Sequence, residues 1–368
     1  MKTTAKIRKN FLYPALRQAG NGRLGWVFRQ IGKFVLLKFI HPFFPSLRVP
    51  GPIMGGFFCT YSCNCNCPMC VRRKPRAGAP DIALDDAKHI IDELVAVDCS
   101  GIGITGGEPL VYPHIVELLA YTASKKIPVT LSTNGCFSGE KALDIAEKLS
   151  RIPLATINIS LDSVDAGKFD ALRGTRGGLA AVRDFTGKLV AERRRERGTT
   201  KITAMCVVSR DNIEDIPAIV SGAKEMGFDS LGLMPMHRTA DGKDASLLLC
   251  DDAACLRRFA DVMAGIPDLS FIDNSARYLE AFPAAFAGAP FPVNCASGKT
   301  ALLVDCDSNV YYCVPELELD KPVVNIKTAG ATLAQVWNGP LYAAKRKAMS
   351  SCRCCYWNCQ SELSLLFS

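Results

Sequence analysis

The first feature that could do chemistry is a short cysteine-rich segment. Residues 59–70 read Cys-Thr-Tyr-Ser-Cys-Asn-Cys-Asn-Cys-Pro-Met-Cys, and one set of these thiols, Cys63, Cys67 and Cys70, fits a CxxxCxxC spacing. Three thiolates on one loop can hold three irons of a cubane iron–sulfur cluster and leave the fourth iron open to another ligand. The alternative is a zinc site in which Cys59 or Cys65 supplies the fourth thiolate.

A second candidate site is the run Gly106-Gly107-Glu108-Pro109, which directly follows an expected strand at 101–105. Two glycines allow the backbone to approach a ligand closely, and the carboxylate of Glu108 is a charged acceptor for an ammonium group. In barrels of parallel strands, binding sites gather at the carboxyl ends of the strands. The position of the motif therefore predicts a binding loop.

Taken together, the two motifs resemble those of the radical S-adenosylmethionine (SAM) family over residues 53–236. The resemblance implies a [4Fe–4S] cluster on the CxxxCxxC loop, which reductively cleaves SAM to a 5′-deoxyadenosyl radical that abstracts hydrogen from a substrate. It also implies a low-potential electron donor of the flavodoxin or ferredoxin type. The SAM-binding residues implied by the resemblance are Gly106, Gly107, Glu108, Pro109, Ser132, Asn134, Ser160, Asp162 and Arg173.

A second group of cysteines lies near the carboxyl end. The segment from Cys295 to Cys313 resembles the opening of a SPASM domain, although Ser308 stands where that domain usually has glycine. The few later cysteines suit its shortened version, called Twitch, and imply one auxiliary [4Fe–4S] cluster. A zinc site on the same thiolates remains the alternative. The expected ligands are Cys295 and Cys313 with two among Cys352, Cys355 and Cys359.

The sequence between the two cysteine groups predicts the strands and helices that would position these residues. Short β-branched runs alternate with amphipathic helical segments, which is typical of βα units around a parallel sheet. Strands are expected at 53–58, 101–105, 128–132, 155–161, 202–208 and 230–234, and helices at 83–97, 113–125, 139–150, 176–195 and 214–226. The predicted fold is α/β, a partial (β/α)6 TIM-like barrel with a small C-terminal Cys-rich β-hairpin/α auxiliary-cluster domain.

The expected organisation has four parts. A basic amphipathic segment, 1–50, ends in a Pro-rich stretch that no helix should cross. It precedes the radical SAM partial barrel at 51–236, a connecting segment at 237–290 and the SPASM/Twitch-like domain at 291–368. At 368 residues and 48% hydrophobic content, the chain can bury a full core.

The distribution of charge and the number of cysteines limit which binding partners and which cellular compartment are expected. The net charge of +8 resides in residues 1–50, which have ten Lys or Arg and no acidic residue, so the remainder is close to neutral. A general nucleic-acid role is disfavoured because the folded body lacks a basic excess. Seventeen cysteines without a visible secretory signal favour metal or cluster ligation in a reducing cytoplasm.

The basic segment contains one further pattern. Leu24, Phe28, Ile31, Val35 and Phe39 recur at helical spacing and predict an amphipathic helix within 19–44. The basic residues make it a poor membrane span, whereas a one-faced basic helix suits the interface of an anionic membrane. The alternative is that the helix packs across the barrel or on a partner. Localisation is therefore expected to be cytoplasmic, with peripheral binding to the inner membrane face left open.

The leading functional hypothesis is abstraction of hydrogen from an unactivated C–H bond of a peptide or other natural-product substrate, because barrels followed by this C-terminal module commonly do so. A membrane-associated enzyme that modifies lipids is the first alternative. The second is a non-catalytic iron–sulfur or zinc protein, which the Gly106–Pro109 motif disfavours because a carrier has no use for it.

Overall fold

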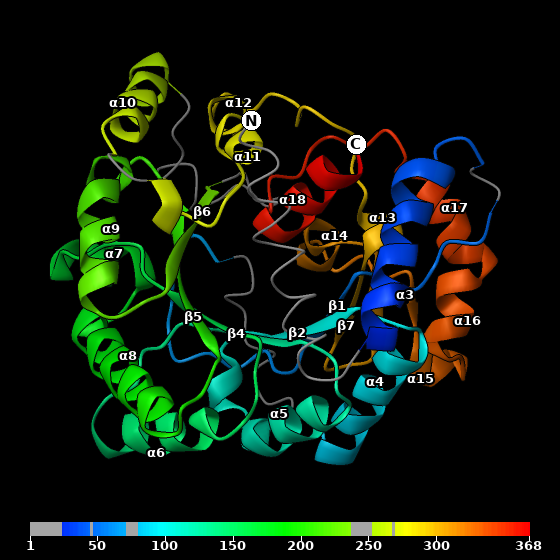
Figure 1. The fold of residues 1–368 in the computed structure, drawn as a ribbon, viewed down its shortest axis with the longest axis horizontal. Helices are drawn as coiled ribbons and strands as arrows, with labels where there is room; N and C mark the ends of the chain where they lie inside the picture. The colour runs from blue at the N-terminus through cyan, green and yellow to red at the C-terminus, as the bar shows by residue number, and fades with distance from the viewer. Residues whose placement is uncertain (1–23, 45–46, 71–79, 237–251, 267–268) are drawn as a thin grey trace.

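The computed structural model describes residues 24–44, 47–70, 80–236, 252–266 and 269–368. Within these residues nine strands form one sheet in the order β6-β5-β4-β3-β2-β1-β7-β8-β9 (Figure 1). The pairs from β6 through β1 to β7 are parallel, and the last two pairs are antiparallel. The sheet is curved but does not close on itself, so the predicted partial barrel is confirmed.

The six expected βα units lie close to the predicted ranges. The strands are β1 (Met54–Phe58), β2 (Gly101–Thr105), β3 (Val129–Thr133), β4 (Thr156–Ser160), β5 (Lys201–Val208) and β6 (Ser230–Pro235). The expected helices that follow the first five strands are α4 (Leu84–Ala96), α5 (Ile115–Ser124), α6 (Gly139–Ser150), α8 (Gly178–Arg195) and α9 (Ile216–Glu225). Figure 1 shows these helices around the outside of the curve, where they cover one face of the sheet.

Alternation along the strands separates the core from the barrel interior. In β3 the side chains of Val129, Leu131 and Thr133 are buried, whereas Thr130 and Ser132, which alternate with them, are partly exposed. Successive side chains of a strand point to opposite faces, so the polar positions share the face away from the helices. Ser132 lies opposite Asn158 of β4 in register, which places polar side chains of neighbouring strands side by side.

One helix that the sequence did not predict contributes to the site. α7 (Ala166–Arg173) begins where the Asp165 side chain accepts a hydrogen bond from the Lys168 backbone at 2.8 Å. It ends at Gly174, whose φ of 58° is a left-handed conformation that favours glycine. The 3-10 helices of the described residues are η3 (Pro109–Val111), η4 (Ile213–Asp215) and η6 (Leu269–Phe271).

The C-terminal hairpin continues the barrel sheet. β7 (Ala301–Asp305) and β8 (Asn309–Tyr311) form the predicted hairpin, β7 also pairs in parallel with β1, and β9 (Val324–Asn325) extends the edge. The turn residue Ser308 has a φ of 67°, which explains why glycine is favoured there. One buried core includes residues of both the barrel and the C-terminal region, and the domain boundaries stay predictions.

The remaining helices are α10 (Ala253–Ala264), α11 (Ala276–Leu279), α12 (Phe282–Phe286), α13 (Ser297–Thr300), α14 (Val314–Glu318), α15 (Ile326–Ala329), α16 (Leu333–Asn338), α17 (Pro340–Ala348) and α18 (Asn358–Phe367).

The N-terminal segment forms the predicted helix. α3 (Leu24–Val35) continues directly into a π-helical stretch, η2 (Leu36–Ile40), and is drawn in blue in Figure 1. No helix in the described ranges is both long and apolar enough to cross a membrane.

Candidate functional site

The cysteine loop leaves β1 and runs along the loop that follows β2. Cys59 donates its backbone N–H to Thr105 at 2.9 Å, Gly107 donates to Thr60 at 2.8 Å, and Glu108 donates to Ser62 at 2.8 Å. A side chain at Gly106 or Gly107 would collide with the backbone of residues 60–62. The glycines are therefore needed for the close approach of these two loops, a role that the sequence analysis did not assign to them.

The three predicted ligands lie on this loop in different surroundings. Cys67 is buried, whereas Cys63 and Cys70 are exposed, and the backbone N–H of Cys70 donates to the Cys67 carbonyl at 3.1 Å. The Cys63 sulfur accepts from the Asn134 side-chain amide at 3.8 Å. Across the parts of the chain that the structure describes, no three Cys, His, Asp or Glu side chains converge as a metal site. The donor set of three soft thiols on one loop nevertheless suits an iron–sulfur cluster.

Glu108 is fully buried between the two loops and the end of β3. Its Oε1 accepts hydrogen bonds from the backbone of Leu110 at 2.9 Å and from the Thr133 hydroxyl at 2.6 Å, and its Oε2 accepts from the Asn134 backbone at 2.6 Å. Burial raises the pKa of Glu108 to about 7, although these donors stabilise the charged form. The carboxylate thereby anchors the glycine loop to β3, and its role toward the SAM ammonium stays a prediction.

Arg173 connects the cysteine loop with the end of β4. Its guanidinium forms an ion pair with the buried Asp162 carboxylate at 2.5 Å, and it also contacts the Cys67 thiol. Burial raises the pKa of Cys67, and the neighbouring positive charge of Arg173 opposes that shift. The Arg173 carbonyl accepts the Asn66 backbone N–H at 3.2 Å, so the end of α7 is also attached to the loop. The sequence predicted Asp162 and Arg173 separately and did not predict this pairing.

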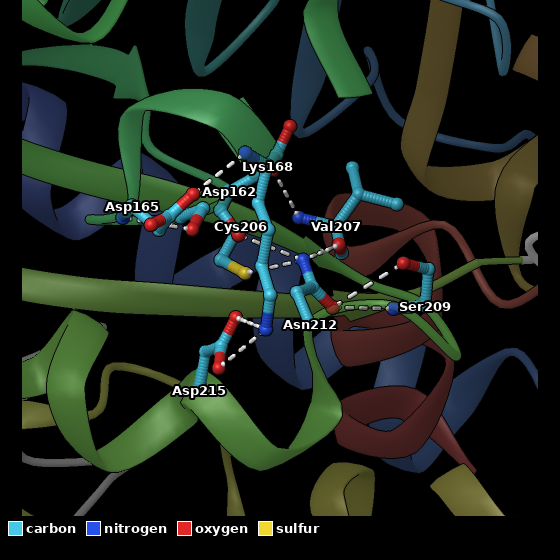
Figure 2. A network of polar contacts seen from close by, with 9 residues as sticks. Asp162, Asp165, Lys168, Cys206, Val207, Ser209, Asn212 and Asp215 are labelled. Atoms are coloured by element: carbon cyan, nitrogen blue, oxygen red, sulfur yellow. Dashed lines mark hydrogen bonds and ion pairs between the residues drawn. The ribbon is translucent and has the colours of Figure 1, made fainter. Parts of the chain in front are cut away.

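Asp162 is itself held from the other side by β5 and the turn after it. Figure 2 shows its side chain accepting the Val207 backbone N–H, at 2.8 Å, while its carbonyl accepts the Asn212 amide, also at 2.8 Å. The same Asn212 amide donates to the Val207 carbonyl at 2.9 Å, and its side-chain oxygen accepts from the Ser209 backbone. Asp162, whose carboxylate pairs with Arg173, is therefore held in position both by β5 and by the turn that follows it.

Ser132 and Ser160 lie on the interior face of neighbouring strands. The Ser132 hydroxyl accepts from the Asn158 amide at 3.3 Å, and the Ser160 hydroxyl donates to the Thr133 carbonyl at 3.5 Å. Asn158 was not among the predicted binding residues. Its position opposite Ser132 on a polar interior face is the signal that could have identified it.

The second cysteine group is assembled from distant segments. The Cys295 backbone donates to the Cys352 carbonyl at 2.8 Å, and Cys295, Cys352 and Cys355 line a cavity of about 10 Å³. Burial raises the pKa of Cys355, and the nearby thiols of Cys295 and Cys313 add to the shift. The Cys352 sulfur lies 3.2 Å from that of Cys354, which the sequence analysis did not include among the ligands.

Asp305 links the two cysteine groups, and the sequence analysis missed it. This buried carboxylate at the end of β7 accepts the Tyr61 hydroxyl at 2.5 Å and the Tyr311 hydroxyl at 2.9 Å. Tyr61 is two residues before Cys63, and Tyr311 is two before Cys313. No local sequence signal pairs Asp305 with Tyr61, because the contact depends on the pairing of β7 with β1.

Comparison with known proteins identifies the domain that carries the first cysteine loop. A model of the radical SAM superfamily matches residues 57–221. These residues therefore form a radical SAM domain, and the protein is identified as an enzyme of the radical SAM type, as the motifs predicted.

Individual relatives extend the likeness beyond the matched domain. The mycofactocin maturase MftC of Mycobacterium ulcerans is 27% identical over 305 residues, which cover 82% of this chain and 79% of the relative. The subtilosin biosynthesis protein AlbA of Bacillus subtilis is 29% identical over 231 residues, which cover 60% and 50%. The structure of Streptococcus suis SuiB bound to its precursor peptide SuiA has a TM-score of 0.64 at 18% identity and covers 93% of this chain and 76% of SuiB. These structural likenesses show the shared fold.

Proposed function

We propose that this radical SAM enzyme abstracts a hydrogen atom from a peptide substrate, with Cys63, Cys67 and Cys70 as the ligands of its catalytic cluster. The observation that carries the proposal is the joining of the CxxxCxxC loop to the Gly106–Pro109 loop by successive backbone hydrogen bonds. When bound there, a [4Fe–4S] cluster supplies the electron that cleaves SAM into methionine and a 5′-deoxyadenosyl radical. A cluster-binding loop and a SAM-binding loop held in this way support that reaction.

Other residues of the chain would bind SAM and balance charge at the cluster loop. The buried carboxylate of Glu108 and the glycines beside it position the SAM amino end, and Pro109 starts the short helix η3 that follows. Ser132, Asn134 and Ser160 offer polar groups at the ends of β3 and β4. Arg173, with its charge shared between Asp162 and Cys67, balances negative charge at the cluster loop. In this proposal Arg173 acts at the cluster loop as well as in SAM binding.

The choice of a peptide substrate draws on the relatives. MftC is named as a maturase, AlbA as a bacteriocin biosynthesis protein, and SuiB is bound to a precursor peptide. The test uses anaerobically reconstituted protein with SAM and a reductant, offered either deuterated peptides or deuterated lipids from the source cells. Deuterium should appear in 5′-deoxyadenosine with the peptide fraction only. Transfer from the lipid fraction alone would overturn the substrate class, and no 5′-deoxyadenosine at all would overturn the reaction.

An electron donor and an auxiliary cluster complete the proposal. An open hollow of about 640 Å³ beside the cysteine loop is lined by Asn64, Cys136, Arg176 and neighbouring residues, and it offers a low-potential donor of the flavodoxin or ferredoxin type an approach from outside. The auxiliary [4Fe–4S] cluster would bind at Cys295 and Cys313 with two among Cys352, Cys355 and Cys359. The gathering of Cys295, Cys352 and Cys355 around one small cavity supports that site.

A further inference from the structure

The N-terminal helix is packed with its polar side against the rest of the protein. Within α3 and η2, the side chains of Gln30 and Lys33 are almost fully buried, as is His41 just beyond η2. Leu37 is the large hydrophobic residue buried on the same side. An amphipathic helix of a globular protein normally buries its apolar side, so this orientation is the reverse of the usual one.

Specific contacts hold the helix in this orientation. The Lys33 ammonium lies 3.0 Å from the Asp98 carboxylate and donates to the Ser100 hydroxyl at 3.3 Å. Arg29 pairs with the same carboxylate at 3.1 Å. Turning the apolar side inward would separate the buried Lys33 ammonium from Asp98 and Ser100, and Arg29 from Asp98. The ion pairs therefore keep the apolar side outward.

The outward side carries large exposed apolar side chains. Leu24, Phe28, Ile31, Val35 and Phe39 form this outer apolar face, and Phe28 is 70% exposed. Ile40, Phe43, Phe44 and Leu47 extend it along the chain, so nine of the thirteen large exposed hydrophobic residues in the described ranges lie between residues 24 and 47. An exposed apolar area concentrated in this way marks an interaction surface.

We propose that the outer apolar face docks on an anionic membrane surface. Residues 1–50, which include the face, have ten Lys or Arg and no Asp or Glu, and the eight besides Arg29 and Lys33, which pair with Asp98, complement anionic lipid headgroups. A second copy of this chain would bring two such basic segments together, and their like charges would repel. Docking flat at the interface suits a one-faced helix that is too charged to span the bilayer.

Docking in this way leaves the radical SAM site accessible. Asp98 and Ser100, which hold the helix, directly precede β2, whereas Gly106 and Glu108 directly follow it. The part of the helix around Lys33 is therefore attached at the opposite end of β2 from the SAM-binding loop. The proposal does not depend on the substrate class, because a docked enzyme can act on either a peptide or a lipid.

The test is flotation of the full-length reconstituted enzyme with vesicles. The protein should float with phosphatidylglycerol-containing vesicles at low salt, and much less with phosphatidylcholine vesicles or at high salt. The double variant Phe28→Glu/Phe39→Glu should lower the bound fraction at least about tenfold. The matched control Leu143→Glu/Leu269→Glu changes exposed hydrophobic residues elsewhere and should float like the wild type. Iron content and SAM cleavage should be unchanged in both variants.

Three outcomes would overturn the proposal. The first is that the wild type fails to float with anionic vesicles, or that the Phe28/Phe39 variant floats as well as it does. The second is that sedimentation shows a dimer that this variant dissociates, without any vesicle binding, which would assign the face to a second copy. The third is that vesicle binding appears only after residues 1–23 are deleted, which would show that this segment covers the face.

Discussion

The two cysteine groups differ in how the chain assembles them. Cys63, Cys67 and Cys70 lie within one loop, which is fastened along its length to the loop after β2 and to the end of α7. Cys295, Cys313 and Cys352 come from segments before β7, after β8 and after α17, and they meet only because those segments pack together. The first group is thus specified by local spacing, whereas the second depends on tertiary contacts.

The comparison predicts the largest effect for the first loop. Cys67→Ala should abolish release of 5′-deoxyadenosine, because two thiolates under-ligate the cubane. The matched control is Cys65→Ala on the same loop, which should keep most of the activity and the iron. Loss of SAM cleavage in the Cys65 variant with retention in the Cys67 variant would show that the assigned register is wrong.

Breaking the ion pair between Arg173 and Asp162, next to the first cysteine loop, should lower the stability of the protein substantially. Arg173→Met leaves the Asp162 carboxylate, which is fully buried, without its ion-pair partner. The expected loss in the free energy of unfolding is about 3–5 kcal/mol, measured by chemical denaturation. Arg176→Met, in the turn just after α7, should cost little. Equal stabilities of the two variants would contradict the role given to the pair.

At the second cysteine group we expect a smaller effect, which is a loss of iron without a loss of SAM cleavage. The wild type should bind about eight irons per chain after reconstitution, and Cys313→Ala should lower this to about four while SAM cleavage continues. The control Cys306→Ala should not change the iron content. About four irons with one zinc in the wild type would instead favour a structural zinc site at the second group.

The smallest effect concerns pH and Glu108. Because its pKa in the folded protein is raised to about 7 from an ordinary value of 4.5, the folded state holds a proton that the unfolded state releases between these values. Stability should therefore fall as pH rises from 4.5 to 7, by about 3 kcal/mol at most, and stay level above that. Glu108→Gln should remove this part of the pH dependence in denaturation midpoints. An unchanged slope in the variant would assign the pH dependence to other groups.

Local sequence patterns were enough to predict the six strands, the helices that follow the first five of them, and the first cysteine loop. Alternation of apolar residues at strand and helix periods depends on neighbours along the chain, so the elements of the barrel lie close to their predicted ranges. The CxxxCxxC and Gly106–Pro109 motifs are equally local, which is why the superfamily was predictable from them.

How distant residues come together could not be predicted from the sequence, because it depends on how the elements pack. The pairing of β7 with β1 joins the C-terminal hairpin to the barrel sheet and brings Asp305 to Tyr61, although 244 positions separate the two residues. The pairing of Arg173 with Asp162 likewise depends on the unpredicted helix α7. The sequence showed that α3 has an apolar and a polar side, but not which side faces the protein. That choice follows from the ion pair of the buried Lys33 side chain with Asp98, a contact between residues 65 positions apart that no local pattern encodes.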